Sequence, residues 1–115
     1  MIHRQGTTKR YSDSTCHHGV VYLVEVPSIE TGDIETQTAD LLANLDKVMA
    51  AAGTDKSRLL QVQVFLTDMD DYDGFNVVWE GWLPEGCAPS RACIEVKGLA
   101  RKGWKVELVL TAAAY

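Results

Sequence analysis

Two segments near the end of the chain alternate between apolar and polar residues, and this alternation limits what the chain can fold into. The apolar positions of these segments are Leu60, Val62, Val64 and Leu66, followed by Trp104, Val106, Leu108 and Leu110. A period of two predicts β-strands that each have one apolar face. Because such a face must be buried against another layer, we expect a sheet that is covered on one side.

Two helices are predicted to form the covering layer. Apolar residues recur with a helical period over residues 34–52, between Asp33, a favoured N-cap residue, and Gly53, which suits the C′ position. A second helix is expected to open in the acidic run 68–73 and to stop at Pro84. The buried side of this second helix is expected to consist of Tyr72, Phe75, Trp79, Trp82 and Leu83.

The remaining strands are predicted from shorter segments. Residues 10–16 and 20–26 are expected to form two strands joined by a turn at His17-His18-Gly19, whereas residues 1–9 are polar and give no assignment. A further strand is expected to open just after Pro89, because proline favours the first position of a strand. The predicted fold is α+β, a sheet of about five or six strands in the order β-β-α-β-α-β-β with both helices on one face.

Length, charge and cysteine usage favour one soluble domain spanning residues 1–115 and argue against several partners. The net charge of −5 and the pI of about 5.0 disfavour binding to nucleic acid or to an anionic membrane surface. No apolar run reaches the ~18–20 residues that span a bilayer, and the N-terminus lacks a signal-peptide core. Three cysteines without CxxC spacing indicate reduced thiols and a cytoplasmic location.

The run Cys16-His17-His18 contains residue types that bind metals. A structural zinc ion takes about four ligands, and no second Cys/His pair follows at a suitable spacing. We therefore expect an exposed turn here and no bound metal.

The face of the predicted sheet opposite the helices is expected to mix polar and apolar side chains. The residues assigned to it are Gln61, Gln63, Phe65, Arg91, Cys93, Glu107 and Val109. This mixture is too apolar for an ordinary solvent face and too polar for a dry core. We therefore expect the face to associate with other copies of the chain, with clefts where the subunits meet.

Arg91 carries the clearest chemical signal, because a guanidinium suits bidentate capture of a carboxylate or phosphate. Glu107 is assigned to the same polar face, on a strand that is expected to pair with the strand of Arg91. The two residues form either a structural ion pair or a site in which the arginine holds an anionic substrate and the glutamate orients a water. Cys93 has no histidine placed to act as its base, so we interpret it as a passive thiol.

Several short motifs occur in an order that matches a known family. The strongest is the sequence APSRACIEV at residues 88–96, which is similar to the signature Pro-x-Arg-x-x-x-x-Val. Supporting motifs are Gln37-Thr38, residues 45–53, residues 64–68, residues 75–79 and residues 105–108. Over nearly its whole length the chain resembles the RidA family, also called the YjgF/YER057c family, and within it the short YoaB-like members.

The resemblance implies a chorismate-mutase-like fold and a homotrimer whose sheets pack into a central barrel, with active sites in the clefts between subunits. It implies that reactive enamines and imines, such as 2-aminoacrylate, are hydrolysed to 2-keto acids and ammonia, with no cofactor. Arg91 is then expected to hold the carboxylate of a small metabolite, and Glu107 to activate the attacking water. Cys93 would contribute backbone contacts, Tyr11 would close the pocket, and Asn76 matches a family asparagine.

The chain departs from the family pattern at Val24-Glu25, where the deaminases carry a Ser-Gly pair beside the substrate. Val24 removes a hydrogen-bonding group, and Glu25 adds a negative charge where an anionic substrate should lie. We hypothesise that Glu25 pairs with Arg91 and thereby blocks carboxylates or changes the ligand class. The alternative function is a non-deaminating, metabolite-binding trimer of the same family. A third hypothesis, the ribonuclease activity attached to relatives, is opposed by the acidic chain, which has no basic groove.

Overall fold

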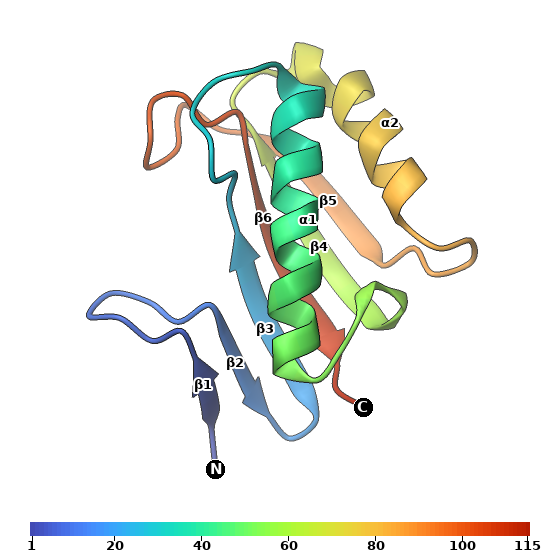
Figure 1. Cartoon of the computed structure of the whole chain (residues 1–115). Helices are drawn as coiled ribbons and strands as arrows, with labels where there is room; N and C mark the ends of the chain where they lie inside the picture. Colours follow the sequence, from blue (N-terminus) through green and yellow to red (C-terminus); the bar gives the residue numbers. More distant parts are fainter.

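Six strands form one mixed sheet, and both helices pack on the same face of it (Figure 1). The computed structural model describes residues 1–115. The elements are β1 (His3–Gln5), β2 (Ser14–His17), β3 (Val20–Glu25), α1 (Ile34–Ala52), η1 (Lys56–Arg58), β4 (Leu59–Leu66), η2 (Met69–Asp71), α2 (Tyr72–Trp82), β5 (Ser90–Glu95) and β6 (Val106–Ala113). The strand order is β1-β2-β3-β6-β4-β5, which confirms the predicted α+β fold with two helices on one face.

The last strand in the sequence, β6, lies in the interior of the sheet. It pairs antiparallel with β3 on one side and with β4 on the other, while β4 and β5 pair in parallel. Alternate residues of β6 are fully buried beneath the helices, as its sequence pattern predicts. The strands and helices share one cluster of 17 buried apolar residues.

Both predicted helices are present, and the ends of α1 are those expected from the sequence. The carboxylate of Asp33 accepts a hydrogen bond from the backbone N–H of Thr36 at 2.9 Å, and Gly53 ends the helix in the left-handed conformation at φ 81°. In α2, Phe75 and Trp79 are buried and stack with a centroid separation of 5.9 Å. Neither helix is both long and apolar enough to cross a membrane.

The strands confirm the N-terminal hairpin and correct three details of the sequence analysis. The first strand, predicted over residues 10–16, spans only Ser14–His17, and His18 and Gly19, at φ 50° and 78°, form the tight turn between β2 and β3. A β-bulge at the start of β4 leaves Leu60 49% exposed and buries Leu59 instead, so the predicted alternation begins only after the bulge. The short edge strand β1 has no sequence signature, because all three of its residues are exposed.

One face of the sheet has no covering layer, and the molecule measures 41 × 37 × 20 Å. We call this surface the open face. By strand register it consists of Tyr22, Val24, Gln61, Gln63, Phe65, Ala92, Ile94, Glu107, Val109 and Thr111. Tyr22 and Val24 are each 50% exposed there and Ile94 is 40% exposed, so the open face is partly apolar. Such a surface is typical of protein interfaces.

Gln37, which is completely buried on α1, connects two loops to the helix. Its Nε2 donates to the carbonyl oxygen of Gly103 at 2.8 Å and to that of Thr31 at 3.3 Å, and its Oε1 accepts from the backbone N–H of Lys105 at 2.8 Å. An added Cβ at Gly103 would lie only 2.0 Å from the carbonyl oxygen of Glu30. The two loops therefore pack backbone to backbone, held by one amide side chain.

Replacing Gln37 with alanine is expected to lower the free energy of unfolding by about 2–4 kcal/mol, because backbone groups of both loops lose their buried partners. Urea denaturation of the purified variant measures this loss. Lys47→Ala, at an exposed position of the same helix, is the control and should change stability by less than ~0.5 kcal/mol. A Gln37 variant as stable as this control would contradict the role assigned to the side chain.

Candidate functional site

Arg91 lies on the edge strand β5, with its guanidinium under α2 rather than on the open face. Its Nη2 donates to the hydroxyl of Tyr72 at 3.1 Å, and the guanidinium carbon lies 5.6 Å from the centre of the Tyr72 ring and 5.7 Å from that of Phe75. These aromatic contacts hold the side chain but do not neutralise its charge. Because a guanidinium has five N–H donors, most of them remain available to a ligand.

A pocket of about 460 Å³ opens beside Arg91, between α2 and the segment that leads into β5. Its lining includes Tyr72, Trp79 and Asn76, together with two glutamates, Glu80 and Glu85. The Oδ1 atom of Asn76 is buried and has no hydrogen-bond partner within the chain. The pocket thus combines a cation, an aromatic wall and two acidic side chains, beside a buried acceptor without a partner.

The prediction that Arg91 and Cys93 lie on the open face is wrong. In the parallel pairing of β4 and β5, Arg91 is level with Val62 and Cys93 with Val64, and both valines are buried beneath the helices. The apolar residues of β5 face the other way, because aromatic side chains of α2 pack over the arginine instead. Burial raises the pKa of the Cys93 thiol, although the nearby Arg91 opposes this, so the reactive thiolate is disfavoured.

Glu107 does lie on the open face, on β6 and level with Phe65 of β4. Its strand does not pair with that of Arg91, because β4 lies between β5 and β6. The strand registers also put the two side chains on opposite faces of the sheet. The prediction that Arg91 and Glu107 lie on the same face is therefore wrong within one chain. Burial raises the pKa of the Glu107 carboxyl. This shift makes Glu107 a stronger base than an exposed glutamate.

Tyr11 and Glu25 line a second pocket of about 360 Å³ at the far end of β3. It lies between the loop at residues 6–13 and the loop at residues 96–105, and Trp104 forms part of its wall. Burial raises the pKa of the Glu25 carboxyl; a hydrogen bond from the backbone N–H of Val26 opposes this, and two further carboxylates nearby add to it. Val24 and Glu25, the two residues at which the chain departs from the family pattern, therefore line a cavity.

The six residues predicted for the site fall into three separate groups in one chain. Arg91, Cys93 and Asn76 lie at the β5 and α2 edge, Glu107 lies on the open face, and Tyr11 and Glu25 line the pocket at the end of β3. The predicted pairing of Glu25 with Arg91 is excluded within one chain, since β6 and β4 separate their strands by roughly 14 Å. A site that uses all three groups needs more than one copy of the chain.

The sequence analysis missed the contribution of Tyr72 and Trp104 to the pockets. Tyr72 was assigned to the buried side of its helix, but it is 38% exposed and holds Arg91. The helical spacing correctly predicts which face of α2 packs on the sheet. It does not show that the edge of this face borders a pocket. The described residues include no group of three or more His, Cys, Asp or Glu side chains that could hold a metal ion.

Comparisons with known proteins agree with this architecture along the whole chain. The model of the family described as "Endoribonuclease L-PSP" matches residues 1–114. A RutC family protein of Haemophilus ducreyi is 42% identical over 114 residues, covering 98% of this chain and 97% of the relative. The chain belongs to the RidA/YjgF family. The RutC family protein YoaB of Escherichia coli is 36% identical, covering 90% of each chain.

Solved structures of RidA/YjgF proteins share the fold. The crystal structure of a YjgF family member from Neisseria meningitidis superposes with a TM-score of 0.95 at 40% identity, covering all of this chain and 96% of that one. The family resemblance proposed from the sequence motifs is therefore confirmed.

Replacing Glu107 with glutamine is expected to stabilise the chain at pH 7. A carboxyl whose pKa is raised by folding loses stability as the pH rises from the ordinary value of 4.5 through the raised value, and glutamine avoids this loss. The advantage of the variant should therefore shrink below pH 4.5. Urea midpoints at both pH values and one protein concentration measure it, with the exposed Glu30→Gln as the control. A stability gain that is the same at both pH values would contradict burial as the cause.

Proposed function

We propose that the protein is a cytoplasmic hydrolase that converts the imines of 2-amino acids, and the enamines in equilibrium with them, to 2-keto acids and ammonia. The observation that carries this proposal is Arg91, whose guanidinium borders a pocket with its charge not neutralised. A carboxylate next to the reacting carbon is the ligand that such a fork of donors fits best. The resemblance to the RidA family implies the same reaction.

Glu107 is proposed as the general base. Its carboxylate takes a proton from water while the water oxygen bonds to the imine carbon, and the C=N electron pair moves to nitrogen to give a carbinolamine. The carboxyl then returns the proton to nitrogen and the C–N bond breaks. The carbinol proton passes to the departing ammonia, so that the protonated imine and water yield keto acid and ammonium. The raised pKa of Glu107 supports both proton transfers.

The proposed active site lies between subunits of a homotrimer whose open faces pack together. Two features support this arrangement: the partly apolar open face, and the separation of Arg91 from Glu107 and Tyr11 within one chain. In the proposed assembly, Arg91 and Asn76 come from one subunit and the Tyr11 pocket from its neighbour.

Glu25 supports a second candidate function, a trimer that binds small metabolites without deaminating them. Its half-buried carboxylate occupies a pocket where the family's deaminases carry glycine. Ribonuclease activity, by contrast, is not proposed, although the family description contains that word. A chain of net charge −5 repels an RNA backbone.

Purified protein is expected to accelerate the loss of imines that an amino acid oxidase generates and that semicarbazide traps. Arg91→Lys should reduce kcat/KM about 10- to 100-fold, because a lysine cannot hold a carboxylate with two parallel bonds. Arg4→Ala, at an exposed position of β1, is the matched control and should leave the rate unchanged. No acceleration by the wild type with any of several imines would reject the deaminase and favour the binding trimer.

The oligomer can be tested separately by light scattering coupled to size exclusion. The wild type is expected to elute as a trimer, and Tyr22→Lys should reduce its mass because a charge on the open face opposes packing of the sheets. Val77→Lys is the matched control, since Val77 is 64% exposed on the outer side of α2. Loss of the trimer in both variants, or in neither, would argue against an interface at the open face.

A further inference from the structure

We infer that the pocket lined by Tyr11, Glu25 and Trp104 binds a cationic group at the end of an apolar chain. This inference rests on the proposed function in one respect: it identifies the cation as the side chain of the imino acid that Arg91 holds by its carboxylate. The substrate class is then a 2-imino acid with a basic side chain, of which a guanidinium is the best-matched case. Three properties of the pocket carry the inference: its shape, its charge and its aromatic walls.

The pocket is concave and built from parts of the chain that are distant in sequence. The loop 6–13 and the loop 96–105 stand on either side of the end of β3 (Figure 1). Its lining includes Tyr11, Asp13, Val24, Glu25 and Trp104. Gln37 holds the second loop by its hydrogen bonds to Gly103 and Lys105, so the wall that carries Trp104 is fixed. A volume of about 360 Å³ accommodates a short alkyl chain with a charged head.

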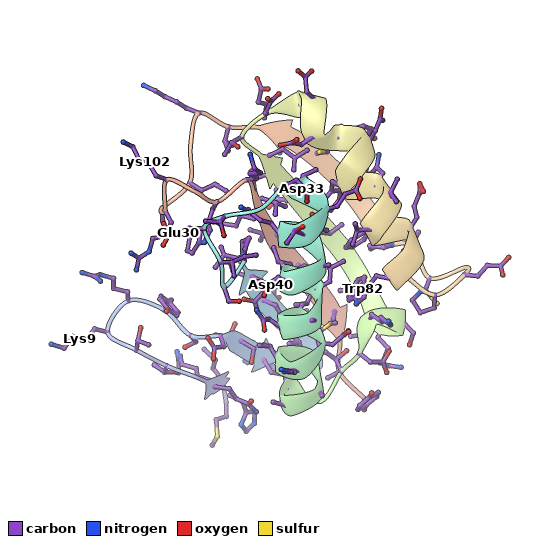
Figure 2. The ribbon with its side chains drawn as sticks, turned by 45° about the horizontal axis from the view of Figure 1, so that its top comes forward. Lys9, Glu30, Asp33, Asp40, Trp82 and Lys102 are labelled. Carbon is purple, nitrogen blue, oxygen red and sulfur yellow. The ribbon has the colours of Figure 1, made fainter.

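The charge in the pocket is negative and is not neutralised from within the chain. The carboxylate of Glu25 accepts one backbone hydrogen bond, from Val26, and the charged groups that act on it are Asp13 and Asp40. Lys9 and Lys102, on the two flanking loops, extend outward from the molecule (Figure 2). A partly buried carboxylate with only acidic neighbours is destabilised, and a bound cation would relieve this.

The remaining walls favour a cation that carries an apolar stem. Tyr11 and Trp104 supply aromatic rings, and guanidinium or ammonium groups bind favourably over such rings. Val24, which replaces a serine of the family pattern, adds an apolar surface for methylene groups. The pair Val24-Glu25 thus suits a ligand with a methylene chain and a terminal positive charge, and it disfavours one that ends in a carboxylate.

Binding is tested first without catalysis, by chemical-shift changes of the wild-type protein on titration with n-propylguanidinium and with n-propylurea. The two probes have the same shape and differ in charge. The expected result is that n-propylguanidinium shifts the signals of the pocket residues, that n-propylurea does so at least tenfold more weakly, and that Glu25→Gln removes the difference. Glu30→Gln, an exposed glutamate on the neighbouring loop, is the matched control and should keep it. Equal binding of both probes, or binding of neither, overturns the inference.

Turnover is tested with the imines of arginine and citrulline, which differ in the same way. We expect kcat/KM to be about tenfold higher for the arginine imine, with the ratio falling toward one in Glu25→Gln and staying unchanged in Glu30→Gln. If the two imines are hydrolysed equally well, the proposed function stands and the inference fails. If neither is hydrolysed but n-propylguanidinium binding depends on Glu25, the pocket is confirmed and the deaminase is rejected.

Discussion

The position of β6 in the interior of the sheet is the constraint on which the rest of the structure depends. Its eight residues alternate between buried and half-buried positions, and pairing with β3 and β4 on its two sides passes that alternation to both neighbours. The buried side chains of these strands all lie on one face of the sheet. That face needs a covering layer, so α1 and α2 both pack on it (Figure 1). The opposite face keeps its half-exposed aromatic and aliphatic side chains without a partner.

This one-sided architecture separates the chemically interesting groups. Arg91 lies at one edge under α2, Glu107 lies on the open face, and Glu25 is the last residue of β3. Each has a charge that the chain itself does not neutralise: a guanidinium held by aromatic rings and two half-buried carboxylates with raised pKa values. An uncompensated, partly buried charge destabilises a monomer. A ligand or a second subunit that supplies the opposite charge or the missing hydrogen bonds removes this penalty. The proposed trimer and the proposed substrate both follow from this arrangement.

The family's deaminase chemistry and the local departure at Val24-Glu25 are compatible in this view. In the proposed complex, the carboxylate end of the substrate contacts the pocket around Arg91, and its side-chain end contacts the pocket around Glu25. A negative charge in the second pocket need not repel a substrate that carries a positive charge there. Whether the chain is a deaminase and which imine it prefers are thus separable properties with separate measurements.

The sequence by itself determined both helices, every strand except β1, the caps of α1, the tight turn at Gly19, the two-layer fold and the family. Those features depend on local periods and on residues that suit one backbone conformation, such as Asp33 and Gly53. Only the tertiary structure decided which face of β5 is covered. Apolar and polar residues alternate there, so a period of two gives two sides without saying which one is buried, and the parallel register with β4 put Arg91 beneath α2. The interior position of β6 and the pocket at Glu25 depend likewise on pairings between distant segments, which a linear pattern does not encode.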